Sequence, residues 1–94
     1  MRLNEYQVEA GKTIDRYRFN HVMEEHAMHG MATELGRLNG YYLHDKQDLR
    51  EDRDIYKRNR IGNLFWYLAE YCTANDWSLE DVARESLSRK QYEK

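Results

Sequence analysis

Three histidines and two glutamates lie close together in the segment HVMEEHAMHG, residues 21 to 30. Imidazole nitrogens favour Zn²⁺ or Ni²⁺, and the spacing of His26 and His29 places both on one side of a helix, with His21 and Glu25 nearby. Two histidines do not complete a ligand set, so the other ligands would have to come from a second helix. We therefore interpret these histidines as surface residues.

Aromatic side chains are the second candidate for binding chemistry. The chain has eight tyrosines and two tryptophans, and Trp66, Tyr67 and Tyr71 could stack on a nucleotide base. Core and interface packing is the more common use of such residues. The 15 basic and 17 acidic residues are well mixed and give a formal charge of -2, so no large basic field is present to hold a phosphate backbone. Nucleic acid is not an expected partner.

The 94 residues form a single domain, residues 1–94, with a core small enough that self-association is expected. The one cysteine, Cys72, lies in an apolar run, where we expect a buried thiol and no internal disulfide. No segment approaches the length of about 20 apolar residues that crosses a bilayer, and the first residues lack the apolar core of a secretory signal. These features predict a cytoplasmic protein with no membrane partner.

The elements that position these residues are expected to be long helices, because the chain has no proline and only five scattered glycines. Tyr6, Ala10, Ile14 and Tyr17 keep a helical step and predict a first helix, joined to the second by a turn near residues 17 to 21. The second helix is expected from about residue 20 to about 44. One apolar face of this second helix comprises Met28, Met31, Leu35, Leu38 and Tyr42.

The charged segment at residues 44 to 54 predicts an exposed connection to a third helix that begins near Asp52 or Asp54. The run IGNLFWYLAEYC, residues 61 to 72, is too long for a typical strand. It has a helical seam made of Ile61, Leu64, Phe65, Leu68 and Cys72. Ser78 and Asp81 form a capping pattern for a fourth helix, with an inward face made of Leu79, Val82, Ala83 and Leu87. The predicted fold is an all-α four-helix bundle.

Four segments resemble, in order and spacing, the small MazG-like members of the all-α nucleoside triphosphate pyrophosphohydrolases. They are LNEYQ, HGMATELGRL, IGNLFWYLAEY and SLEDVARESLSRK, and together they span nearly the whole chain. The resemblance implies a four-helix protomer that assembles as a homodimer or tetramer. It also implies an active site that binds Mg²⁺ and splits a nucleoside triphosphate into monophosphate and pyrophosphate. Such proteins occur in bacteria and in phages.

The family's metal site needs four acids, in an E-x-x-E motif on the second helix and an E-x-x-D motif on the third. In this chain the first motif becomes Glu34 with Arg37, and the second becomes Arg60 with Asn63. Glu34 is the one acid retained, and the amide of Asn63 is at best a weak neutral ligand. One glutamate with two arginines carries a charge of +1 where the family pattern carries four negative charges, so Mg²⁺ is not expected to bind. We predict that metal-dependent hydrolysis has been lost and that no cofactor is needed.

Two uses of the altered site stay open. Arg37 and Arg60 could pair with Glu34 across the bundle in a metal-free electrostatic lock, or they could hold an anionic nucleotide. We favour the lock because the sequence contains no other phosphate cradle. If the resemblance were accidental, Glu34 with Arg37 would be a surface ion pair, and Arg60 with Asn63 a solvated face.

The resemblance also places Ser86 and Arg89 where the family often presents an asparagine and a basic residue to the nucleotide. Arg89 keeps the charge, whereas Ser86 has a shorter reach. Three functions remain: a non-catalytic binding protein; a metal-free nucleotide binder that uses Arg37, Arg60, Ser86 and Arg89; and a residual pyrophosphohydrolase. The last would need Mg²⁺ held by Glu34 and by other acids. Candidates for these acids are Glu24, Glu25, Asp52 and Asp54.

Overall fold

The computed structural model describes residues 1–14, 19–45 and 53–92 of the chain. Four α-helices make up most of these residues: α1 (Leu3–Gly11), α2 (Asn20–Gly40), α3 (Arg53–Ala74) and α4 (Leu79–Tyr92). A short π-helical turn, η1 (Tyr41–Asp45), extends α2. The described residues contain no strand, which confirms the all-α prediction.

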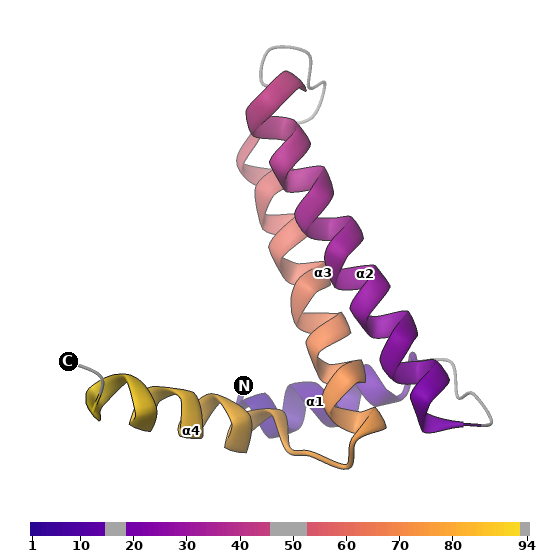
Figure 1. Ribbon diagram of the computed structural model, residues 1–94, viewed down its shortest axis with the longest axis vertical. Coiled ribbons are helices and arrows are strands. Elements are labelled where there is room, and N and C mark those ends of the chain that lie inside the picture. The colour runs from indigo at the N-terminus through magenta and orange to yellow at the C-terminus, as the bar shows by residue number, and fades with distance from the viewer. Residues whose placement is uncertain (15–18, 46–52, 93–94) are drawn as a thin grey trace.

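The two longest helices form an antiparallel hairpin, and α1 and α4 lie across its base (Figure 1). The second helix, α2 continued by η1, ends at Asp45, and α3 starts at Arg53. Both helices therefore lie close to their predicted limits. None of the helices described is long and apolar enough to cross a membrane.

The first helix is shorter than its apolar spacing predicts. It ends at Gly11, and the hydroxyl of Thr13 donates a hydrogen bond of 2.9 Å to the carbonyl oxygen of Ala10 at that end. Ile14 is buried beyond the helix, where it packs with Met23 and Ala74. The prediction that the first helix continues through Ile14 is therefore wrong. The non-helical turn after Gly11 brings the Ile14 side chain into the core. Tyr17 lies outside the described residues.

The core lies at the base, where α1, α3 and α4 meet. Small residues allow this close packing, and the main cluster consists of Ala10, Ala69, Cys72 and Leu79. Trp66 packs against this cluster and also against the neighbouring one around Met23. Cys72 is buried as predicted, and burial raises the pKa of its thiol.

The N-terminus of α4 is held by its own cap and by α1. The backbone N–H of Asp81 donates to Ser78 Oγ at 3.2 Å, which confirms the predicted cap. Gln7 Oε1 accepts a 2.8 Å hydrogen bond from the N–H of Leu79. Arg2 lies 2.8 Å from Glu80, and this hydrogen bond lowers the pKa of the Glu80 carboxyl. These bonds fix the start of α4 on α1.

The apolar faces of the helices are less buried than amphipathic spacing predicts. Leu79 at the start of α4 is buried and Val82 is half-buried, but Leu87 is exposed, so its predicted inward position is wrong. The reason is that α4 extends away from the base and its last turns have no helix beside them (Figure 1). On α2 and α3, the predicted apolar faces are likewise largely open to solvent.

Candidate functional site

Glu34 is buried in the middle of α2, with only 4% of its side chain exposed. It lies on the side of α2 that faces α3, one helical turn before Arg37. Arg37 Nη1 donates a hydrogen bond of 3.0 Å to Glu34 Oε1. The Arg37 side chain is half exposed. Arg37 therefore reaches water, whereas the carboxylate of Glu34 does not.

The second partner of Glu34 comes from α3. Arg60 Nε lies 3.2 Å from Glu34 Oε2, and 18% of the Arg60 side chain is exposed. These two atoms are oriented so that they make no hydrogen bond with each other or with any other group described. Their contact is thus electrostatic, and it confirms the predicted pairing of Glu34 with both arginines across the two helices.

Tyr56 contacts this ion-pair cluster through the guanidinium of Arg60. The centre of its ring lies 5.1 Å from Arg60 Cζ, within the range of a cation–π contact. Its hydroxyl donates a 3.3 Å hydrogen bond to the backbone carbonyl oxygen of Arg37. Tyr56 precedes Arg60 by one helical turn, a spacing visible in the sequence that sequence reasoning missed.

The charges in this cluster are unfavourable for a divalent cation. Hard cations such as Mg²⁺ bind where several oxygens carry negative charge, whereas Glu34 already has two guanidinium groups beside it. Asn63, at the fourth position of the predicted site, is exposed on α3. In the part of the chain that the structure describes, no three or more His, Cys, Asp or Glu residues gather as a possible metal site.

Ser86 and Arg89 lie on a different part of the molecule. Both are on α4, which crosses the base of the hairpin and does not contact α2 (Figure 1). Ser86 is half-buried and Arg89 is exposed. A single protomer therefore does not bring the four predicted nucleotide-binding residues together.

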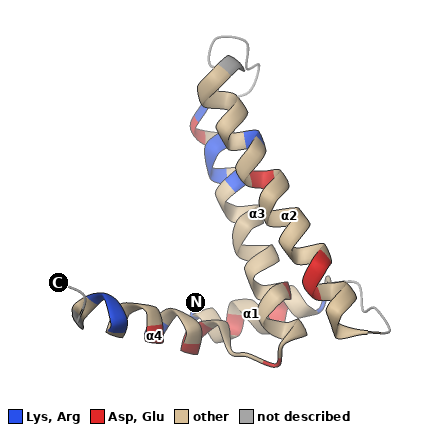
Figure 2. Ribbon diagram, viewed as in Figure 1, with Lys and Arg blue, Asp and Glu red and all other residues tan. Residues whose placement is uncertain are grey.

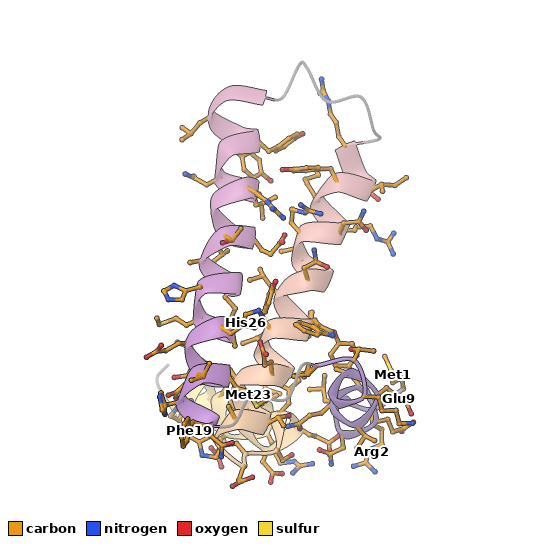
Figure 3. The ribbon with its side chains drawn as sticks, turned by 90° about the vertical axis from the view of Figure 1, so that its right-hand side faces the viewer. Met1, Arg2, Glu9, Phe19, Met23 and His26 are labelled. Carbon is orange, nitrogen blue, oxygen red and sulfur yellow. The ribbon has the colours of Figure 1, made fainter. Side chains whose placement is uncertain are left out.

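A second buried acid, Glu70, lies between the same two helices and was missed. Its side chain is fully buried, and His26 Nδ1 on α2 lies 2.8 Å from Oε1 and 3.0 Å from Oε2. Figure 3 shows His26 in the lower half of the hairpin, between α2 and α3. The available signal was an acid inside an apolar run, directly after Ala69 and two residues before Cys72.

The other candidate ligands lie apart. His21 stacks on Phe19, with ring centres 5.6 Å apart, and Glu24 accepts a 3.0 Å hydrogen bond from the side chain of Asn75. Asp54 is on the surface, 3.8 Å from Arg58. His29 and Glu25 are exposed, and Asp52 lies outside the described residues. Among those candidates that the structure describes, none is paired with Glu34 or its two arginines.

The aromatic residues serve packing within the protomer. Trp66 Nε1 donates a 2.9 Å hydrogen bond to Thr13 Oγ1. The ring of Tyr67 lies directly against Gly30, where any Cβ would collide with it. Glycine at position 30 thus allows α2 and α3 to approach each other. Tyr71 packs near Trp77, with ring centres 6.2 Å apart.

Comparisons of this chain with protein-family models, with curated proteins and with solved structures found no match.

Proposed function

We propose that this chain is a MazG-like protein that has lost Mg²⁺-dependent nucleotide hydrolysis and acts in the cytoplasm as a binding protein that assembles with itself. The observation that carries the proposal is the buried carboxylate of Glu34, held by Arg37 at 3.0 Å and Arg60 at 3.2 Å. A cation that entered this site would have to displace two guanidinium groups, and it would then be bound by the single negative charge of Glu34.

The same contacts favour protein binding over nucleotide binding. A metal-free nucleotide would be recognised by arginines whose donors are available to its phosphates. Glu34 offsets part of the positive charge of Arg37 and Arg60, Arg60 is only 18% exposed, and Arg89 is on α4, which lies at the base of the hairpin. The electrostatic lock therefore stabilises the helix pair and leaves its outer surface for recognition.

Thermal melting with added ligands separates the three functions. We expect the melting temperature to stay within about 1 °C of its starting value when Mg²⁺, Mn²⁺ or a nucleoside triphosphate without metal is added, because ligands stabilise only the state that binds them. A rise with metal that is lost in Glu34→Gln would indicate a residual hydrolase. A rise with metal-free nucleotide that is lost in Arg37→Ala would indicate a nucleotide binder. Either rise would contradict the proposal.

A further inference from the structure

An open groove runs along the side of α3 that is turned away from α2. Arg60 faces Glu34 on α2, and Gly62 lies about 200° further around α3, because one residue turns a helix by about 100°. Two adjoining hollows of about 340 Å³ and 310 Å³ make up the groove, and Gly62 and Phe65 line both of them. Volumes of this size lie at the lower end of the range for small-molecule sites.

Gly62 forms the floor of the groove because it has no side chain. A Cβ on Gly62 would meet no atom within 4 Å beyond its chain neighbours and its own helix backbone, so the space above it is open. Ile61 and Phe65, each 43% exposed, border this space on α3. Leu3 and Tyr6 on α1 line the lower hollow, where the rings of Tyr6 and Phe65 meet edge to face, with centres 6.3 Å apart. The groove therefore offers a continuous apolar surface from α3 to α1.

The two ends of the groove differ in charge. Lys57 and Arg58 line the upper hollow, and Figure 2 shows basic residues concentrated in this upper part of α3. Arg58 has a loose contact of 3.8 Å with Asp54, and both side chains are largely exposed. Among the described residues, no acid is paired with Lys57. At the lower end, Arg2 is neutralised by Glu80 at 2.8 Å. Unbalanced positive charge therefore lies at the upper end of the groove.

We propose that this groove binds a single-chain amphiphilic anion, a carboxylate with an unbranched hydrocarbon tail. The carboxylate lies beside Lys57 and Arg58, and the tail runs past Gly62 into the hollow between α3 and α1. Charge complementarity fixes the end at which the head group binds, and burial of the tail supplies most of the affinity. The site is separate from the Glu34 cluster and goes beyond the proposed function, because its ligand is a small molecule.

Isothermal calorimetry with sodium decanoate, below its micelle-forming concentration, measures binding to the wild-type protein. A ten-carbon chain suits the groove, because α3 rises about 12 Å between Lys57 and Phe65. We expect one decanoate per chain, and octanoate should bind about tenfold more weakly because it buries two methylene groups fewer. Decyltrimethylammonium has the same chain length and the opposite charge, and it should bind at least about tenfold more weakly. Equal affinity for this cationic probe would overturn the proposed anion site.

Gly62→Leu tests the position of the site, since the new side chain would fill the open space at the floor of the groove. We expect it to weaken decanoate binding at least about tenfold. The matched control is Gly36→Leu, because Gly36 is exposed on α2 and a Cβ there also meets no atom within 4 Å. Leucine favours a helix more than glycine does, so both variants should fold. Equal affinities in the two variants would show that decanoate binds elsewhere and would refute the proposed site.

The orientation of the ligand has its own test. Replacing Lys57 and Arg58 together with glutamine should weaken decanoate binding at least about tenfold without weakening that of decyltrimethylammonium. In nuclear magnetic resonance spectra, the terminal methyl group of bound decanoate should show Overhauser effects to the ring protons of Tyr6 and Phe65. Effects from this methyl group to Lys57 instead would contradict the proposed orientation.

A second copy of the chain is the alternative occupant of an open apolar groove. Light scattering during size-exclusion chromatography distinguishes the two, because a lower molar mass in Gly62→Leu than in Gly36→Leu would assign the groove to a protein interface. That result would overturn the proposal, and so would the absence of decanoate binding to folded wild-type protein. Neither outcome bears on metal chemistry at Glu34, so the two proposals fail separately.

Discussion

A variant with Arg37→Glu, Arg60→Glu and Asn63→Asp is expected to bind Mg²⁺, which the wild-type chain should not bind. The three new acids would join Glu34 on facing sides of α2 and α3, where Arg60 already approaches Glu34 to 3.2 Å. Four carboxylates at such distances repel one another, so the variant should melt at a lower temperature without metal and regain stability with it.

Isothermal calorimetry measures directly the affinity of this variant for Mg²⁺. The matched control adds Glu34→Gln to the three substitutions, which removes one ligand charge while keeping the size of the side chain. We expect this control to bind at least about tenfold more weakly, since affinity depends on the number of charged ligands. A folded triple variant with no heat of binding would show that these four positions do not form a metal site.

Replacing Glu34 with glutamine should destabilise the protein by about 1–3 kcal/mol, because Arg60 would remain largely buried without a counter-charge. The control is Glu9→Gln. Glu9 also lies 3.0 Å from a basic side chain three residues later, Lys12, but about two thirds of both side chains are exposed. An exposed pair of this kind contributes little, so the control should lose less than about 0.5 kcal/mol.

Urea unfolding followed by circular dichroism gives both free energies under the same conditions. Equal losses in the two variants would mean that Glu34 contributes no more than a surface ion pair, and the electrostatic lock would have no structural role. The free energies of the two variants are compared at one fixed protein concentration, because the apparent stability of a dimer depends on concentration.

Local signals in the sequence predicted much of the fold and part of the site. The hydroxyl of Ser78 caps α4 as its spacing from Asp81 predicts, because capping depends on a few neighbouring residues. The pairing of Glu34 with Arg37 was predictable for the same reason, since three residues separate them on one helix. The contact with Arg60 was predicted from the family resemblance, which places Arg60 and Glu34 in one site on two helices.

Features that depend on how helices pack were not predictable from the same signals. Periodicity identifies the apolar face of a helix but not whether a neighbour from the same chain covers it, so Leu87 was expected inside and is exposed. Burial of Glu70 depends on His26, which is 44 residues away in the chain. The hairpin buries the acids Glu34 and Glu70, whereas an apolar side chain such as Leu35 is 54% exposed.

The most direct test of the proposed loss of catalysis is pyrophosphate release from ribo- and deoxyribonucleoside triphosphates, with Mg²⁺ and then Mn²⁺, by wild-type protein at high concentration. We expect no release above the rate without protein, because Glu34 is paired with Arg37 and Arg60, and the described residues form no cluster of acids around it. Metal-dependent release that disappears in Glu34→Gln would contradict this expectation. It would show that other carboxylates complete an active site around Glu34.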